Sequence, residues 1–215
     1  MIRLACLLIG YIFGLFQTAF FYGKAKGIDI RQHGSGNSGT TNALRVLGTK
    51  AGLIVFAGDC LKCVLAVCLC RVLFGDSHSD KLYLLCLYTA AGAILGHNFP
   101  FYMGFKGGKG IAATAGLILA FHPYFIPVGA ILFFGIFFTT HYVSLGSLLV
   151  YVGFMIEIVI CGQCGLFGMS QVNLNEMYLV ALFLAVMAFW KHRENIVRLV
   201  KGEERKTYLT KKNKV

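Results

Sequence analysis

The sequence is poor in charged residues. Only 13% of its 215 residues are charged, with 20 Lys and Arg against 9 Asp and Glu. Soluble domains carry about 25% charged residues, so this scarcity argues against a soluble protein. Apolar residues fill the chain instead, because hydrophobic residues make up 57% of it and the mean hydropathy is +0.71. The sequence therefore predicts an all-α protein that crosses a membrane several times.

Other missing features exclude further classes. No small-residue cleavage site follows the first apolar run, so we expect no cleaved signal peptide. Cys60 and Cys63 have zinc-like spacing, but no second ligand pair accompanies them, so we expect neither a metal nor a cofactor. Six of the eight cysteines lie inside apolar runs and are expected to be small buried residues. Cys161 and Cys164 lie near a predicted outer loop, where a disulfide, a redox pair or two free thiols all fit the spacing.

Seven apolar segments are candidate membrane spans within one domain covering residues 1–215. A span needs ~20 residues at ~1.5 Å per residue, so several of these are short. The segments are Arg3–Phe21, Ala51–Phe74, Leu82–Leu95, Ile111–Phe121, Tyr124–Phe138, Leu145–Cys161 and Met177–Trp190, followed by a basic tail, Lys191–Val215.

The positive charge is distributed unevenly between the two sides of this topology. The formal net charge of +11 would suggest a nucleic-acid partner in a soluble protein, but here we expect none. If the loop after the first span is cytoplasmic, 16 of the 20 Lys and Arg residues lie on that face, Arg3, Arg71 and Lys81 lie on the other, and Lys62 lies within a span. The positive-inside rule then puts the N-terminus outside and the C-terminus in the cytoplasm, with the tail able to bind anionic lipids.

The first predicted cytoplasmic loop is polar and rich in glycine. It reads His-Gly-Ser-Gly-Asn-Ser-Gly-Thr-Thr-Asn-Ala-Leu-Arg-Val-Leu-Gly over His33–Gly48. A helix is predicted from Thr40, with Ser38, Thr40 or Thr41 as its cap, and Arg45 lies one turn in. A glycine loop that leads into a helix N-terminus suits an anion, and an arginine adds a charge shaped for phosphate. The alternative is a plain surface loop.

The second predicted cytoplasmic loop ends in Gly104-Phe-Lys-Gly-Gly-Lys-Gly110. It is not a Walker A motif, because Met103 replaces the required first glycine and Gly110 replaces Ser or Thr. Glycines beside Lys109 still form a general anion nest. A hairpin whose lysines only follow the positive-inside rule is the alternative.

The tail contributes a titratable side chain. His192 and Asn195 are three residues apart and share a helix face. Histidine is the residue best suited to proton transfer near neutral pH, although an interfacial histidine without a chemical role has the same pattern. Asp59 and Lys62 share a face of the second span in the same way and are expected to pair, either as a structural ion pair or as part of a functional site.

Three long motifs resemble those of one family. They are Gly27–Gly48, Gly96-His-Asn-Phe-Pro with Phe105-Lys-Gly-Gly-Lys-Gly110, and His192-Arg-Glu-Asn-Ile-Val-Arg-Leu with Gly202-Glu203. In order and spacing they are similar to the motifs of the bacterial acyl-phosphate:glycerol-3-phosphate acyltransferases, over nearly the whole chain. One departure is the first span, where many members have Gly-Ser-Ile-Pro and this chain has Gly14-Leu-Phe-Gln-Thr. Gln17 and Thr18 are expected to take over that role.

The resemblance implies a function and a set of site residues. It implies an integral-membrane enzyme of about seven helices that moves an acyl group from acyl phosphate to glycerol 3-phosphate, giving lysophosphatidic acid and phosphate. Its implied partners include membrane lipids, and we expect the enzyme to be a monomer. The implied catalytic residues are Ser35, Arg45, His192 and Asn195, and Glu203 is structural. The implied substrate-binding residues are Asn37, Thr41, Gly104, Lys106, Gly107, Gly108, Lys109, Gly110 and Ser144.

Two questions stay open at the level of sequence. Acyl transfer could be direct, or it could pass through Ser35 as an acyl-enzyme with His192 as base. A carrier for a phosphate ester would also place broken helices and cations around an anion, but carrier sites lie near the midplane, often between repeats, and no repeat is present here. A lipid-binding scaffold would explain the basic tail but not the two glycine loops.

Overall fold

The computed structural model describes residues 1–209, and every regular element in that range is helical. The predicted basic tail therefore ends in six residues, 210–215, that lie outside the described part. The α-helices are α1 (Ile2–Gly14), α2 (Thr18–Ala25), α3 (Thr40–Leu47), α4 (Thr49–Phe74), α5 (Leu82–Asn98), α6 (Ile111–Phe121), α7 (Phe125–Thr140), α8 (Val143–Gln163), α9 (Gln171–Lys191) and α10 (Arg193–Val200). Short 3-10 helices are η1 (Ile30–Gln32), η2 (Ser79–Lys81) and η3 (Phe101–Met103).

Helices occupy all seven apolar segments, with shifted boundaries. Five helical segments are long and apolar enough to cross a membrane, namely Ile2–Ala25, Thr49–Phe74, Ser79–Met103, Val143–Gln163 and Gln171–Lys191. The helices α6 and α7 are shorter, with 11 and 16 residues. The helix α9 begins six residues before the predicted Met177, because the Ser170 side chain caps it by accepting a bond from the backbone N–H of Asn173.

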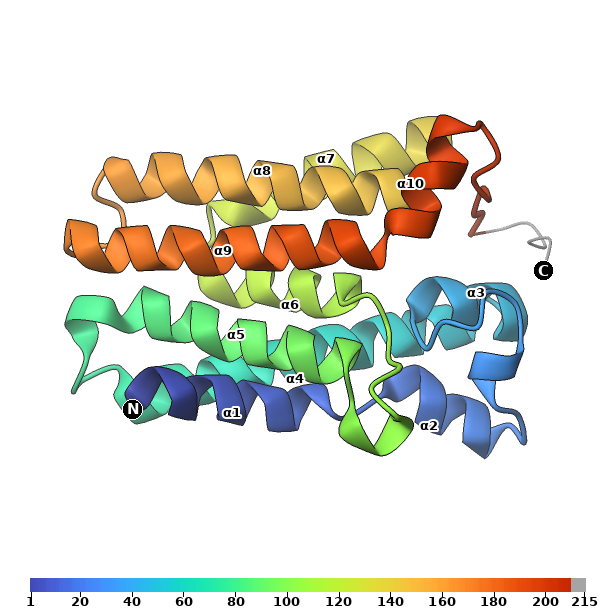
Figure 1. Ribbon diagram of the computed structural model, residues 1–215, viewed down its shortest axis with the longest axis horizontal. Coiled ribbons are helices and arrows are strands. Elements are labelled where there is room, and N and C mark those ends of the chain that lie inside the picture. The colour runs from blue at the N-terminus through green and yellow to red at the C-terminus, as the bar shows by residue number, and fades with distance from the viewer. Residues whose placement is uncertain (210–215) are drawn as a thin grey trace.

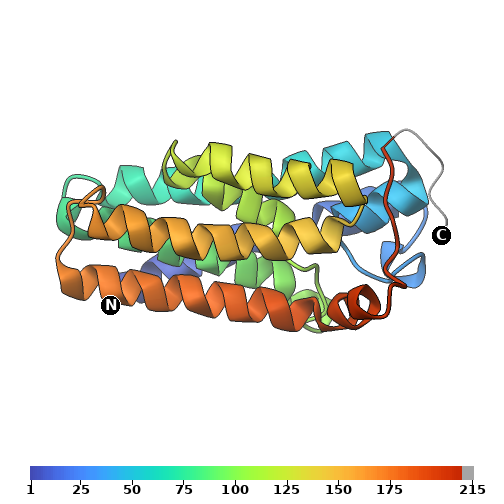
Figure 2. The same cartoon turned by 90° about the horizontal axis from the view of Figure 1, so that it is seen from above.

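The long helices lie side by side, and the polar segments gather at one end of the bundle. Helix α1 packs against α5, α4 against α6, and α7 and α9 against α8. Figures 1 and 2 both place α2, α3 and α10 at the same end, together with the last described residues. We call this the site end, made of residues 18–50, 99–110 and 193–209. Both glycine loops and the tail therefore meet, as the charge count predicted.

Small residues allow α1 and α5 to touch backbone to backbone. A Cβ added to Gly10 would lie 1.8 Å from the Thr89 carbonyl oxygen, and one added to Gly92 would lie 2.0 Å from the Leu7 carbonyl oxygen. The opposite face of α1 is exposed at Leu4, Leu8 and Ile12, spaced by one helical turn. In a bilayer that face meets lipid, and close packing of small residues holds the helix to its neighbour.

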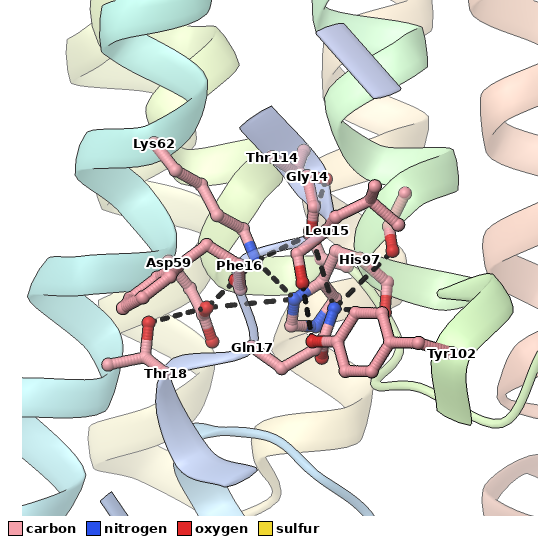
Figure 3. A network of polar contacts seen from close by, with 12 residues as sticks. Gly14, Leu15, Phe16, Gln17, Thr18, Asp59, Lys62, His97, Tyr102 and Thr114 are labelled. Atoms are coloured by element: carbon pink, nitrogen blue, oxygen red, sulfur yellow. Dashed lines mark hydrogen bonds and ion pairs between the residues drawn. The ribbon is translucent and has the colours of Figure 1, made fainter. Parts of the chain in front are cut away.

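The first predicted span is not one continuous helix, because the chain breaks between Gly14 and Thr18. Gln17 donates from Nε2 to the carbonyl oxygens of Gly14 (3.2 Å) and His97 (3.1 Å), and Thr18 donates to Asp59 (2.9 Å). Gln17 thus satisfies carbonyl groups at the ends of α1 and α5, and Thr18 joins the break to a side chain of α4 (Figure 3). The break expected from the resemblance is thus present without a proline.

Candidate functional site

A cavity of about 740 Å³ opens at the site end. Most of its wall comes from four parts of the chain, residues 34–45, 105–112, 143–147 and 190–205. Phe56, Asp59, His97, Phe99 and Phe133 complete the wall. The volume is within the range of small-molecule sites. Segments separated by more than a hundred residues therefore form one pocket.

Asn42 holds the first glycine loop in shape. Its Oδ1 accepts a bond from the Ser35 N–H (2.8 Å), and its Nδ2 donates to the carbonyls of Ile30 (3.1 Å) and His33 (3.0 Å). Gly34 has φ +63°, and a Cβ there would lie 2.4 Å from Asn42 Oδ1. A glycine is therefore required at position 34 for both reasons. Asn42 is a positioning residue that the sequence did not single out.

The predicted polar residues of this loop face the cavity with their side chains available. Ser35, Asn37 and Thr41 all line it, and within the described chain no hydrogen bond occupies their side chains. Helix α3 begins at Thr40 as predicted, but Gly39 is its N-cap and no side chain caps it. The hydroxyl groups of Ser38 and Thr40 are buried without a partner instead. The predicted side-chain cap is wrong.

Arg45 links α3 to the end of the described chain. Its Nη2 donates to Thr207 Oγ1 (2.7 Å) and to the Arg205 carbonyl (3.1 Å), and its Nε is buried without a partner. Burial, and then the nearby charge of Arg205, lower the pKa of the guanidinium from its ordinary value. The Thr207 N–H also bonds to the carbonyl of His141, which ends α7 with φ +62°. A segment of the tail therefore closes one side of the cavity.

The second glycine loop is fixed by the end of α5. The N–H groups of Gly107 and Gly108 donate to the carbonyls of Asn98 and His97, both at 3.1 Å. Of the predicted binding residues, Lys106, Gly107, Lys109 and Gly110 line the cavity, whereas Gly104 and Gly108 do not. Gly104 is exposed, and Gly108 is buried against the His97 ring.

Lys109 points from this loop to the third motif. Its ammonium donates to Asn195 Oδ1. Burial, and then repulsion from Arg198, lower the pKa of Lys109 to about 8. The ammonium is thus held at a site where an added anion would stabilise it.

A carboxylate organises the third motif, and it belongs to Glu204. Its Oε1 accepts bonds from Asn195 Nδ2 (2.7 Å) and Ser144 Oγ (2.9 Å), and its Oε2 pairs with Arg198 Nε (2.8 Å). Glu204 is 9% exposed, whereas Glu203 is exposed. The structural role expected of Glu203 therefore falls to its neighbour. Nothing in the sequence pattern separates these two adjacent glutamates.

His192 lies at the junction of α9 and α10 and is buried in the cavity wall. Its Nδ1–H donates to the Ala188 carbonyl (2.8 Å), which leaves Nε2 as the acceptor of a neutral ring. Burial, and then the charge of Lys109, lower the pKa of His192 to about 4. The imidazole is therefore neutral at pH 7. His192, Lys109 and Asn195, which were expected to belong to one site, therefore lie together in the wall of the cavity.

The remaining sequence predictions concern cysteine and a buried charge pair. All eight cysteines lie in the described range and are free, including Cys161 and Cys164, so no disulfide joins those two. Asp59 and Lys62 pair as predicted, with Lys62 Nζ 2.9 Å from Asp59 Oδ1. Both are buried, and Asp59 reaches the base of the cavity.

The cavity is built to hold anions close to a lipid surface. Arg45, Lys109 and Arg198 bring positive charge to the cavity from three segments of the chain. The only buried carboxylates in its described wall are Asp59 and Glu204, and each is paired with a cation. An uncompensated surplus of cations in a partly buried site favours phosphate groups.

Known proteins are similar to this chain over most of its length. A family model described as glycerol-3-phosphate acyltransferase matches residues 4–202. The chain is 39% identical to a glycerol-3-phosphate acyltransferase of Bacillus cytotoxicus over 210 residues, covering 97% of this chain and 96% of that protein. It is 38% identical to the protein of the same name from Mycoplasmopsis synoviae, covering 92% and 91% of the two chains.

Two solved structures share the fold. Both are crystal structures of PlsY (YgiH), an integral membrane glycerol 3-phosphate acyltransferase. The glycerol 3-phosphate form superposes with a TM-score of 0.81 at 30% identity, covering 96% of each chain. The lysophosphatidic acid form gives a TM-score of 0.78 at 30% identity, covering 95% of this chain and 94% of that one. With the cavity and the three motifs, these matches show that the chain belongs to the glycerol-3-phosphate acyltransferase family.

Proposed function

We propose that this protein transfers a fatty acyl group from acyl phosphate to the sn-1 hydroxyl of glycerol 3-phosphate at the cytoplasmic surface of the membrane. The products are lysophosphatidic acid and phosphate. The family and the two forms of PlsY support acyl transfer to glycerol 3-phosphate. The observation that carries the proposal is the single cavity, where two glycine loops, Arg45, Lys109 and a neutral His192 meet.

The chemistry of the cavity supports acyl phosphate as the donor. Acyl phosphate and glycerol 3-phosphate each bring one phosphate, and the cavity offers two glycine loops with a cation beside each. The loop of Gly107, Lys109 and Gly110 is suited to the acyl phosphate, and the loop of Ser35 with Arg45 to the acceptor. Acyl phosphate is an activated anhydride, so alignment and charge neutralisation can supply most of the catalysis.

The reaction we propose is a direct transfer. The acceptor hydroxyl oxygen attacks the acyl carbon, the bond from that carbon to the phosphate oxygen breaks, and the hydroxyl proton passes to the departing phosphate. His192 Nε2 is an acceptor that can orient the hydroxyl, because Nδ1–H is committed to Ala188. Lys109 neutralises the charge that gathers on the leaving phosphate.

A route through Ser35 is the rival mechanism. It needs a base within hydrogen-bond reach of the serine, and within the described chain no such bond joins Ser35 to His192. A burst of phosphate in the absence of glycerol 3-phosphate would support the acyl-enzyme. No burst, together with Ser35→Ala protein that still binds acyl phosphate, supports direct transfer.

The test of the donor uses purified protein in detergent or liposomes. Glycerol 3-phosphate is supplied with either palmitoyl phosphate or palmitoyl-CoA, and lysophosphatidic acid is measured. We expect lysophosphatidic acid when the donor is palmitoyl phosphate and none when the donor is palmitoyl-CoA. Product with palmitoyl-CoA alone would contradict the proposal, and counterflow of labelled glycerol 3-phosphate without any donor would favour the carrier.

We also propose that the enzyme is monomeric, because the residues of one chain are enough to enclose the cavity. We place the site in the cytoplasm because the loops and tail of the site end are rich in Lys and Arg, as the positive-inside rule requires of the cytoplasmic face.

A further inference from the structure

A buried polar network lies directly beneath the second glycine loop. Asp59, Lys62 and His97 are 0%, 5% and 2% exposed, although all three belong to helices of the bundle. Figure 3 shows them gathered beside the break between α1 and α2. Ionisable side chains at such a depth are costly and tend to have a function.

Lys62 is the centre of this network. Its Nζ lies 2.7 Å from the Phe16 carbonyl oxygen, 2.9 Å from Asp59 Oδ1 and 2.9 Å from His97 Nδ1. The Gly14 carbonyl oxygen is also close, at 3.2 Å. The three shorter contacts use the three N–H groups of the ammonium, and the Gly14 carbonyl also accepts from Gln17 Nε2. The contact with Phe16 satisfies a carbonyl that the helix break exposes, which explains a lysine in this place. It does not explain why a histidine completes the set.

The contact with Lys62 fixes the tautomer of His97. An ammonium group only donates, so Nδ1 must be the acceptor. The proton of the neutral imidazole is then on Nε2. Asp59 holds the ammonium in place from the other side, while Thr18 donates to the same Asp59 oxygen at 2.9 Å. The network therefore keeps the His97 ring in the tautomer that has its proton on Nε2, at the outer edge of the ring.

That outer edge faces the second glycine loop. A Cβ on Gly108 would lie 2.0 Å from His97 Nε2, so the ring edge occupies the space beside that glycine. His97 also lines the cavity. In the described chain its Nε2 has no hydrogen-bond partner, while both Nδ1 and the backbone carbonyl are engaged.

We propose that His97 is a further substrate-binding residue, whose Nε2–H donates to the phosphoryl group held by the loop of Gly107–Gly110, and that Lys62 and Asp59 are positioning residues that keep this donor in place. Lys106, Gly107, Lys109 and Gly110 of this loop line the cavity, and a neutral N–H adds a hydrogen bond there without adding another charge. The inference rests on the proposed binding of a phosphate ester in this cavity.

Two amide replacements separate the two ring nitrogens. In His97→Asn, the amide oxygen lies near the former position of Nδ1 and can still accept a hydrogen bond from Lys62. The shorter asparagine side chain does not reach the loop. His97→Gln places an amide nitrogen near Nε2 and can still donate to a phosphate. Binding of inorganic phosphate to each purified protein is measured by its concentration-dependent rise in Tm, which needs no catalysis.

We expect His97→Asn to bind phosphate about 10- to 100-fold more weakly than the wild type, as for loss of one hydrogen bond to a charged group. His97→Gln is expected to stay within about threefold of the wild type, because the donor is replaced. If His97→Asn and the wild type bind phosphate equally, the inference fails, whether or not lysophosphatidic acid is formed. Equal losses in both variants would also overturn it.

A spectroscopic measurement tests the positioning residues and does not depend on activity either. Protein labelled with ¹⁵N-histidine should show His97 with an unprotonated Nδ1 and a protonated Nε2. The assignment comes from the signal that is lost in His97→Gln. The opposite tautomer in the wild type would overturn the inference. In the active enzyme, His97→Asn should raise KM for palmitoyl phosphate and change kcat less, whereas general misfolding would lower the amount of active protein at unchanged KM.

Discussion

At the scale of single residues, the site depends on a few buried polar groups that each hold several partners. Glu204 joins Ser144, Asn195 and Arg198, and Asn42 joins three points of the first loop. In a chain with so few acidic residues, each buried carboxylate has a cation beside it. Removing one partner from such a set leaves the others buried without compensation, which is more harmful than the loss of the bond alone.

Glu204 gives the first prediction, with Glu203 as its matched control. Glu204→Gln removes the charge that holds Arg198 and weakens the bonds to Asn195 and Ser144. We expect the free energy of unfolding to fall by about 1–3 kcal/mol and kcat/KM to fall at least about tenfold. Glu203→Gln, at an exposed position, should change stability by less than about 0.5 kcal/mol. Thermal unfolding in detergent and the acyltransfer assay measure both, and equal effects would contradict the assignment.

The second prediction concerns pH and Lys109. Its pKa is lowered to about 8, so the ammonium that receives the phosphate loses its proton as the pH rises through this value. We therefore expect kcat/KM, which reports the free enzyme, to fall above about pH 8. In Lys109→Arg this fall should disappear, because arginine stays charged. A fall at the same pH in both proteins would assign the titration to another group.

At the scale of helices, packing depends on where glycine meets backbone. Gly10 and Gly14 of α1 lie against α5, and Gly92 and Gly96 of α5 lie against α1. This reciprocal arrangement brings the end of α5, with His97 and Asn98, next to the break after α1. The helix pair thereby positions the second glycine loop as well as stabilising the bundle.

Gly10 and Gly135 form the pair for the third prediction. A Cβ at Gly10 would lie 1.8 Å from a backbone oxygen, so Gly10→Ala must push α1 away from α5. We expect it to destabilise the protein by about 1–3 kcal/mol, as overpacking does. Gly135→Ala in α7 meets nothing within 4 Å, and alanine favours a helix, so this variant should be neutral or more stable. A lower Tm for both would contradict this account, because only Gly10→Ala brings a new atom against a backbone oxygen.

Apolar runs and charge patterns predicted the elements of this fold well, because both are local properties. Helix ends were less predictable. Ser170 begins α9 early, and Gln17 stabilises a break that no proline announces. The glycine loops and Arg45 were identified from residue types that bind anions, and His192 was identified from its titratable ring. Asn42, Glu204 and the partners of Arg45 were not identified, since their roles come from contacts between distant segments that no spacing encodes.

At the scale of the whole molecule, the distribution of polar residues directs the chemistry to one membrane surface. The loops at the site end hold both glycine motifs, and the opposite end holds Arg3 and Lys81. A water-soluble phosphate ester and a donor with an acyl chain can both reach a cavity placed there. The convergence of three distant segments at this end is the central claim.

Labelling from the two sides of the membrane tests this claim most directly. One cysteine at a time is introduced at the exposed positions His33, Lys106 and Lys201, and at Asp80 on the opposite end. The native exposed Cys68 and Cys164 and the half-buried Cys161 are replaced by serine, so that the remaining native cysteines are buried. A maleimide that cannot cross the membrane is added to right-side-out and inside-out vesicles. We predict that the first three positions react only in inside-out vesicles and that Asp80→Cys reacts only in right-side-out vesicles. If His33→Cys and Lys201→Cys react from opposite sides, the shared cavity cannot exist.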